Sequence, residues 1–112
     1  MLVWKAAVAL AVACYAATQA FPQSEIYGMS SQIRRSSASI AANIAEGHGR
    51  ENTGSFIQLL RVAQGSLKEL ETHLIIAGRV GLMPENAMNA LLKDADEIGR
   101  MLRSMVRSLQ KR

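Results

Sequence analysis

The sequence has few of the residues that most catalytic and metal sites use. Among its 112 residues are one cysteine, two histidines, two prolines and one tryptophan. Cys14 stands alone and cannot form an internal disulfide, so nothing points to an oxidising compartment. Two histidines and one cysteine leave little material for a transition-metal site. The chain therefore offers little support for metal-dependent or disulfide-based chemistry.

The apolar content is high and largely aliphatic. Apolar residues make up 49% of the chain and aromatic residues only 4%. Most of the remainder is Ala, Leu, Ile, Val and Met, side chains that suit helix–helix packing. No segment alternates apolar and polar residues with the period of two that a strand requires. We expect a single all-α domain over residues 1–112, long enough to bury its own core.

Four segments have helical spacing, at about 2–20, 29–46, 53–80 and 84–111. Residues that favour helix ends separate them: Pro22, Gly47, Gly49, Asn52 or Thr53, Gly81 and Pro84. In the first segment, the spacing of Trp4, Val8, Ala11 and Tyr15 predicts one packed face.

The other three segments show longer apolar seams. The second has Met29, Ile33, Ser36, Ile40 and Ile44. The third has Phe56, Leu60, Ala63, Leu67, Leu70, Leu74 and Ala77. The fourth has Leu91, Ala95, Ile98, Leu102, Met105 and Leu109. Steps of three and four residues are typical of helices that pack at shallow angles. With short connections, they predict an antiparallel up-down-up-down four-helix bundle.

The apolar N-terminal segment allows other interpretations. Residues 1–20 carry one charge, and Thr18 and Ala20 resemble a signal-peptide cleavage site. The length also fits a short membrane span. The seam spacing favours a packed helix instead.

Basic residues lie on one face of the fourth segment. Arg100, Arg103, Arg107 and Lys111 fall within an arc of roughly 80° on a helix, opposite the apolar seam. No acidic residue occurs between Arg100 and Arg112. Such a row can follow a phosphate backbone. The alternative is an ordinary solvated face whose cations complement the helix dipole.

Arg34 and Arg35 form a second basic point on the predicted second helix. Adjacent helical residues point about 100° apart, so at most one of them faces the core. An ion pair with Glu69 or Glu71 is as good an interpretation as ligand binding.

Three patterns in the sequence resemble catalytic or metal-binding motifs only weakly. Residues 46–50 contain two glycines, but lack the preceding strand and the Lys-Ser/Thr ending of a phosphate loop. Glu69 and His73 do not have the Glu-x-x-His spacing of di-iron bundles. Cys14 lies in an apolar helix far along the chain from either histidine. We expect no enzyme activity, no cofactor and no metal.

Several polar motifs occur in a familiar order. They are Tyr27-Gly28, Gln32-Ile-Arg34-Arg35, Ile40-Ala-Ala-Asn43-Ile-Ala-Glu46-Gly47-His-Gly49-Arg50 and Gly65-Ser66-Leu-Lys-Glu69-Leu70-Glu71-Thr72, preceded by Val3-Trp4-Lys5-Ala6 and Phe21-Pro22. In these motifs the chain resembles the bacterial four-helix bundle proteins encoded in intervening sequences of 23S ribosomal RNA genes. That family is similar in fold to the accessory variability protein of diversity-generating retroelements. The chain departs from the pattern in starting almost at the Val-Trp motif and in having Ala41 where relatives often have proline.

The resemblance implies a non-enzymatic bundle that forms ring-shaped homo-oligomers, with pentamers the known arrangement. It also implies that residues 1–20 are a bundle helix and not a signal. The retroelement relative binds nucleic acid and a reverse transcriptase through basic surface. Arg34, Arg35 and Arg50 match basic family positions, whereas the row from Arg100 to Lys111 is this sequence's own feature.

Two hypotheses follow for a cytoplasmic protein. In the first, the bundle binds RNA or DNA through these basic residues. In the second, it is a scaffold that docks a protein partner, such as a reverse transcriptase, without touching nucleic acid.

Overall fold

The computed structural model describes residues 1–112, which form four α-helices and one short 3-10 helix. The α-helices are α1 (Leu2–Thr18), α2 (Met29–His48), α3 (Thr53–Arg79) and α4 (Glu85–Gln110). The 3-10 helix η1 (Gln23–Glu25) lies between α1 and α2. There is no strand, so the all-α prediction is confirmed.

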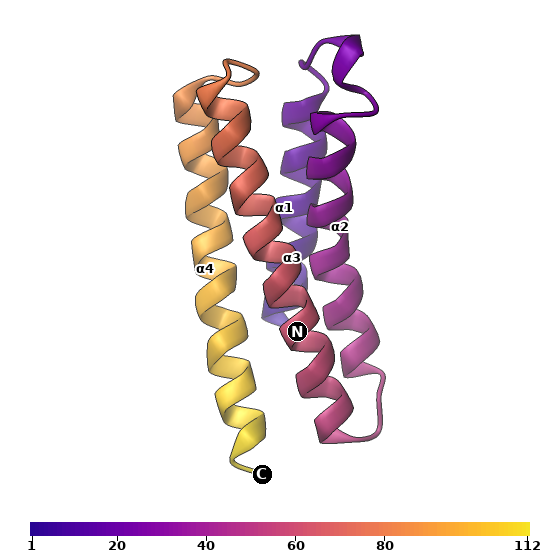
Figure 1. Ribbon diagram of the computed structural model, residues 1–112. Coiled ribbons are helices and arrows are strands. Elements are labelled where there is room, and N and C mark those ends of the chain that lie inside the picture. The colour runs from indigo at the N-terminus through magenta and orange to yellow at the C-terminus, as the bar shows by residue number, and fades with distance from the viewer.

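Consecutive helices run antiparallel, as the predicted up-down-up-down bundle requires (Figure 1). Each helix packs against the next, most extensively α2 against α3, and α4 closes the bundle on α1. The molecule is a rod of 47 × 23 × 18 Å. This topology places the start of α1, the end of α2, the start of α3 and the end of α4 at one end of the rod.

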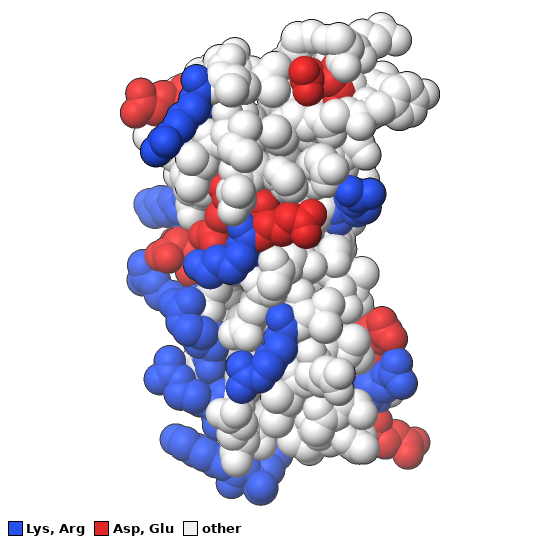
Figure 2. Space-filling model, viewed as in Figure 1, with Lys and Arg blue, Asp and Glu red and all other residues white.

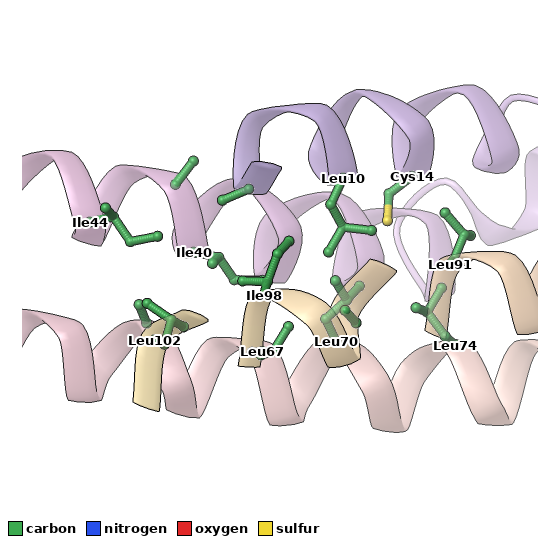
Figure 3. Packing of buried hydrophobic residues seen from close by; sticks show 14 of the residues in the cluster. Leu10, Cys14, Ile40, Ile44, Leu67, Leu70, Leu74, Leu91, Ile98 and Leu102 are labelled. Carbon is green, nitrogen blue, oxygen red and sulfur yellow. The ribbon is translucent and has the colours of Figure 1, made fainter. Parts of the chain in front are cut away.

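Leucine and isoleucine side chains from all four helices meet along the axis of the bundle (Figure 3). Ile40, Leu70, Leu74 and Leu102 are 0% exposed. Burying such a side chain contributes roughly 1.5–3 kcal/mol. The seams predicted for α2 and α3 are confirmed, with their first members Met29 and Phe56 only half-buried. The seam predicted for α4 is confirmed except at Met105, which is half-buried, while the neighbouring Val106 is buried in its place.

The predicted buried face of α1 is wrong. Trp4 and Tyr15 are 39% and 45% exposed. The buried face lies next to it and consists of Val3, Ala7, Leu10, Cys14 and Thr18. Seven of the 17 residues of α1 are alanine and nearly all the others are apolar, so its faces differ little in polarity. Packing against α2 and α4 selects the face that is buried.

Two helix ends differ from the predicted positions. α1 ends at Thr18, where the hydroxyl donates to the carbonyl oxygen of Cys14 at 2.9 Å. α2 continues to His48, past Gly47, and Gly49 follows as its C-cap. Gly47 is buried against α3, and a Cβ atom there would lie 2.8 Å from the Phe56 ring. Gly47 therefore allows α2 and α3 to pack closely and does not terminate α2.

The start and end of α3 follow from local chemistry. The Asn52 side-chain oxygen accepts a hydrogen bond from the backbone N–H of Ser55 at 2.8 Å, so Asn52 is the N-cap. Beyond the C-terminus of α3, Gly81 adopts φ = 83°, a left-handed conformation that glycine accepts without a steric penalty. Pro84 then immediately precedes α4.

Candidate nucleic-acid interface

Charge along α4 separates into an acidic half and a basic half. Four acidic residues lie on the helix before Arg100, and from Arg100 to Arg112 the chain has five basic residues and no acidic one. Figure 2 shows the resulting cationic side chains along the lower half of α4, below a band of acidic side chains. A cationic surface of this kind attracts polyanions over several ångströms.

The helical period directs these cations outward. On the last three turns, Ile98, Leu102, Val106 and Leu109 are buried against the other helices. Basic residues occupy the opposite side and are exposed: Arg100, Arg103, Arg107 and Lys111. The predicted row therefore lies in solvent, with successive members about one helical turn apart.

Most of the row lacks a carboxylate partner. Arg100 forms an ion pair with Asp96, one turn back on the same helix. None of the ion pairs in the structure involves Arg103, Arg107 or Lys111. These three cations are uncompensated and are available to an external anion.

The topology adds further cations to the same end of the rod. Arg50, in the turn between α2 and α3, and Arg112 line one hollow of about 250 Å³, which the acidic Glu51 also lines. Arg50 also pairs with Glu46 at 2.7 Å, and this exposed pair restrains it only weakly. We call the combined surface the basic end: Arg50, Arg100, Arg103, Arg107, Lys111 and Arg112.

The sequence predicts Arg50 and the α4 row as basic residues but does not predict that they lie at the same end of the bundle. It does not point to Arg112. The up-down order contains the missing signal, because α2 and α4 run in the same direction and so end at the same end of the bundle.

A groove of about 740 Å³ opens beside the basic end. Its apolar lining comes from the start of α1, from Phe56 and from the last turns of α4, where Met101 is 38% exposed. Arg100 and Arg112 also line it. An apolar groove with cationic residues in its lining suits an acidic, partly apolar segment of another protein.

Arg34 and Arg35 lie far from this surface, near the start of α2 at the other end of the rod. The Nε of Arg34 donates to the Thr18 hydroxyl at 2.9 Å, and its guanidinium lies 5.0 Å from the centroid of the Tyr15 ring. Arg35 is exposed and bonds to Gln32 at 2.7 Å.

The alternative ion pairs of these arginines are absent. Glu69 lies 3.5 Å from His73, and Glu71 pairs with Lys68 at 3.2 Å. Neither carboxylate forms an ion pair with Arg34 or Arg35.

Groups with catalytic potential are dispersed. No three His, Cys, Asp or Glu side chains come together as a metal ion would require. Burial raises the pKa of the Cys14 thiol to about 12, Ser37 lowers it in part, and the charge of Asp94 adds to the increase. A thiol in this state is a poor nucleophile. No helix combines the length and apolarity needed to cross a bilayer.

Comparison with known proteins agrees with the fold and the motifs. Residues 1–104 match the model of the 23S rRNA-intervening sequence protein family. The chain belongs to this family. Its structure is similar to that of a protein of unknown function from the S23 ribosomal protein family of Bacteroides thetaiotaomicron, with a TM-score of 0.84. The two sequences are 27% identical, and the match covers 93% of this chain and 97% of the other. None of the curated proteins matches the chain.

Proposed function

We propose that this 23S rRNA-intervening sequence protein is a non-enzymatic, ring-forming bundle of the bacterial cytoplasm that binds RNA or DNA through its basic end. The observation that carries the proposal is the row of uncompensated cations on α4. Arg103, Arg107 and Lys111 are exposed, one turn apart and without a carboxylate partner. Nucleic-acid phosphates would neutralise them and release counterions to the solvent.

The outer face of α1 supports assembly into a homo-oligomer. Lys5 is the sole charged residue before Glu25, so most of α1 carries no charge. Val12 is 64% exposed on this helix, next to exposed alanines and Tyr15. Apart from Lys5 near its start, this helical face carries no charge, which fits an interface between copies of the chain. A pentameric ring would present five basic ends at once. Such multivalency raises affinity without new contacts.

Nucleic-acid binding is tested by fluorescence anisotropy with a structured RNA and a DNA duplex at two salt concentrations. We expect binding that weakens steeply as salt rises. The triple variant Arg103→Gln, Arg107→Gln, Lys111→Gln should bind at least about tenfold more weakly and with a shallower salt dependence.

A matched variant controls for net charge. Lys68→Gln, Arg79→Gln, Lys93→Gln removes the same number of cations from outside the basic end. It should bind nearly as the unmodified protein does. Absence of binding at low salt, or equal losses in both triple variants, would refute an interface at the basic end.

Ring formation is tested by light scattering coupled to size-exclusion chromatography. We expect a pentamer mass for the unmodified protein and a smaller species for Val12→Glu, because a carboxylate would be desolvated in the interface. Gln19→Glu adds the same charge at an exposed position beyond the end of α1 and should leave the mass unchanged. A monomer mass for the unmodified protein would refute ring formation but would not contradict the proposed binding of nucleic acid.

The groove beside the basic end favours a second candidate, a scaffold for a protein partner. Its apolar lining has no role in phosphate binding, and a protein segment would bury it. This candidate predicts that Met101→Glu abolishes capture of the partner, whereas the triple variant of the basic end captures it normally. Capture that survives nuclease treatment and depends on Met101 would favour this candidate over nucleic-acid binding.

A further inference from the structure

A separate polar pocket lies at the other end of the rod, where α1 ends and α2 begins. Its volume is about 400 Å³, and its lining is Thr18, Gln19, Phe21, Pro22, Gln23, Ile26, Ser30 and Arg34. Helix and turn residues thus border an open pocket that is large enough for a small ligand. Unlike the groove beside the basic end, it contains a fixed guanidinium and a buried hydroxyl.

The Arg34 guanidinium is held in place but has no anionic partner. Its Nε is engaged by Thr18, and the Tyr15 ring lies against one of its faces. Thr18 cannot neutralise it, because the hydroxyl is uncharged and itself donates to backbone carbonyls of α1. The terminal NH groups of Arg34 make no ion pair in the structure. A partly buried cation of this kind favours an external anion.

Ser30 supplies a second donor without a partner. The residue is 4% exposed and lines the pocket, and its hydroxyl takes part in none of the side-chain hydrogen bonds of the structure. The only fully buried side-chain nitrogen or oxygen atoms without a partner are those of the His73 imidazole, so the Ser30 hydroxyl opens onto the pocket and can donate to a ligand there. Ser30 lies one turn before Arg34, and helical side chains tilt toward the N-terminus, so the two groups are directed to the same space.

The backbone of α2 adds donors at this point. Ser30 and Ser31 stand in the first turn, where N–H groups have no partner within the helix, and neither N–H is bonded elsewhere. Glu25 occupies part of this terminus, because its carboxylate accepts from the N–H of Met29 at 3.2 Å. Glu25 does not line the pocket, but its charge opposes the binding of an anion.

We propose that this pocket binds a phosphate monoester through Arg34, Ser30 and the N-terminal N–H groups of α2. Donors from a guanidinium, a hydroxyl and a helix terminus approach from different directions, which suits a tetrahedral oxyanion with three free oxygens. The ligand's source is a free mononucleotide or the terminal phosphate of a nucleic-acid strand. The pocket is remote from the basic end and does not rest on the function proposed above.

The test is an NMR titration of isotope-labelled protein with inorganic phosphate, at constant ionic strength maintained with sodium chloride. We expect saturable shifts of the Ser30 and Ser31 amides and of the Arg34 Nε–H. Arg34→Gln should weaken the affinity at least about tenfold, as loss of a charge-assisted hydrogen bond does. Ser30→Ala should weaken it less and leaves the packing nearly unchanged, so it keeps the test valid if Arg34→Gln is unstable.

Two further variants make the test specific. Arg35→Gln removes an adjacent cation that points away from the pocket, and it should bind phosphate with unchanged affinity. Glu25→Gln removes the opposing charge and should bind more tightly. Absence of saturable shifts, or equal losses for Arg34→Gln and Arg35→Gln, would overturn the proposal.

Additional ligands distinguish the two possible sources of the phosphate. A nucleoside 5′-monophosphate is compared with a single strand that ends in a 5′-phosphate and with the same strand ending in a 5′-hydroxyl. If the nucleoside 5′-monophosphate binds most tightly, the natural ligand is a free nucleotide. If a strand binds at this pocket only when it carries the 5′-phosphate, the natural ligand is a terminal phosphate. The triple variant of the basic end should respond to inorganic phosphate normally, so the two proposals fail independently.

Discussion

Arg34 and Arg35 are adjacent in the chain and differ in nearly everything else. Arg34 lies between α1 and α2, and its Nε donates a hydrogen bond to Thr18, whereas Arg35 extends into solvent and contacts Gln32. The rotation of about 100° per residue predicts that they face different surroundings. It does not predict which arginine turns inward or that Thr18 and Tyr15 receive it, because those contacts come from another helix.

Cys14 also takes its properties from its neighbours. It is 0% exposed, and burial raises the pKa of its thiol to about 12. We expect an alkylating reagent at pH 8 to leave the folded protein unmodified and to label it fully in denaturant, since the thiolate is the reactive form. Mass spectrometry after timed alkylation gives the answer, and rapid labelling of the folded state would contradict this burial.

The same thiol makes stability depend on pH in alkaline solution. The folded pKa lies above the ordinary value of 9.0, so the folded state holds its proton more tightly than the unfolded chain does. Its contribution is complete below pH 9 and is lost as pH rises toward about 12. Cys14→Ala should therefore lose less stability over that interval than the unmodified protein, as chemical denaturation at several pH values would show.

At the scale of single helices, two glycines have opposite roles. Gly65 is exposed in the middle of α3, and a Cβ atom there would meet nothing within 4 Å. Gly47 is buried in α2, and a Cβ atom would press on Phe56 and Leu59. Gly65 lowers the stability of α3 without a packing benefit, whereas Gly47 permits α2 and α3 to approach closely.

Alanine substitutions should separate these roles. Gly65→Ala should raise the free energy of unfolding by about 0.5–1 kcal/mol, because alanine favours the helix. Gly47→Ala should lower it by roughly 1 kcal/mol, because overpacking outweighs the same gain in propensity. Urea denaturation measures both, and stabilisation by Gly47→Ala would show that the α2–α3 contact adjusts freely.

At the scale of the whole molecule, the basic end concentrates like charges that repel one another. Arg103 stands between Arg100 and Arg107 at spacings of three and four residues. Like charges at these spacings destabilise a helix modestly. Arg103 is also too far from the end of α4 to gain much from the helix dipole.

Neutralising this residue should therefore stabilise the protein. We expect Arg103→Gln to raise the melting temperature at low salt, by an increment that disappears at high salt as the charges are screened. Lys93→Gln, in the acidic half of α4, should not raise it. A gain from Arg103→Gln that is independent of salt would show that the cause is not charge repulsion.

The helices and most of their buried seams could be predicted from the sequence alone. On α3 and α4, leucine, isoleucine and alanine recur at steps of three and four between polar residues, and this local pattern leaves one face to bury. Exposure of Arg103 and Arg107 follows from the same pattern, because they lie opposite that face. Local spacing also placed the start of α3 at Asn52 or Thr53, since capping depends on neighbours in the chain.

The features that depend on contacts between helices could be known only from the tertiary structure. The alanine-rich α1 has no clear polar side, so contact with α2 and α4 determined that Leu10 is buried and Tyr15 exposed. Packing against Phe56 made Gly47 an interior residue of α2 and not its end. Arg50 and Arg112 line one hollow, and Arg34 donates a hydrogen bond to Thr18, although the residues of each pair are distant in sequence. The physical reason is that periodicity encodes how one helix divides its surface, whereas neighbours are set by how all four helices pack together.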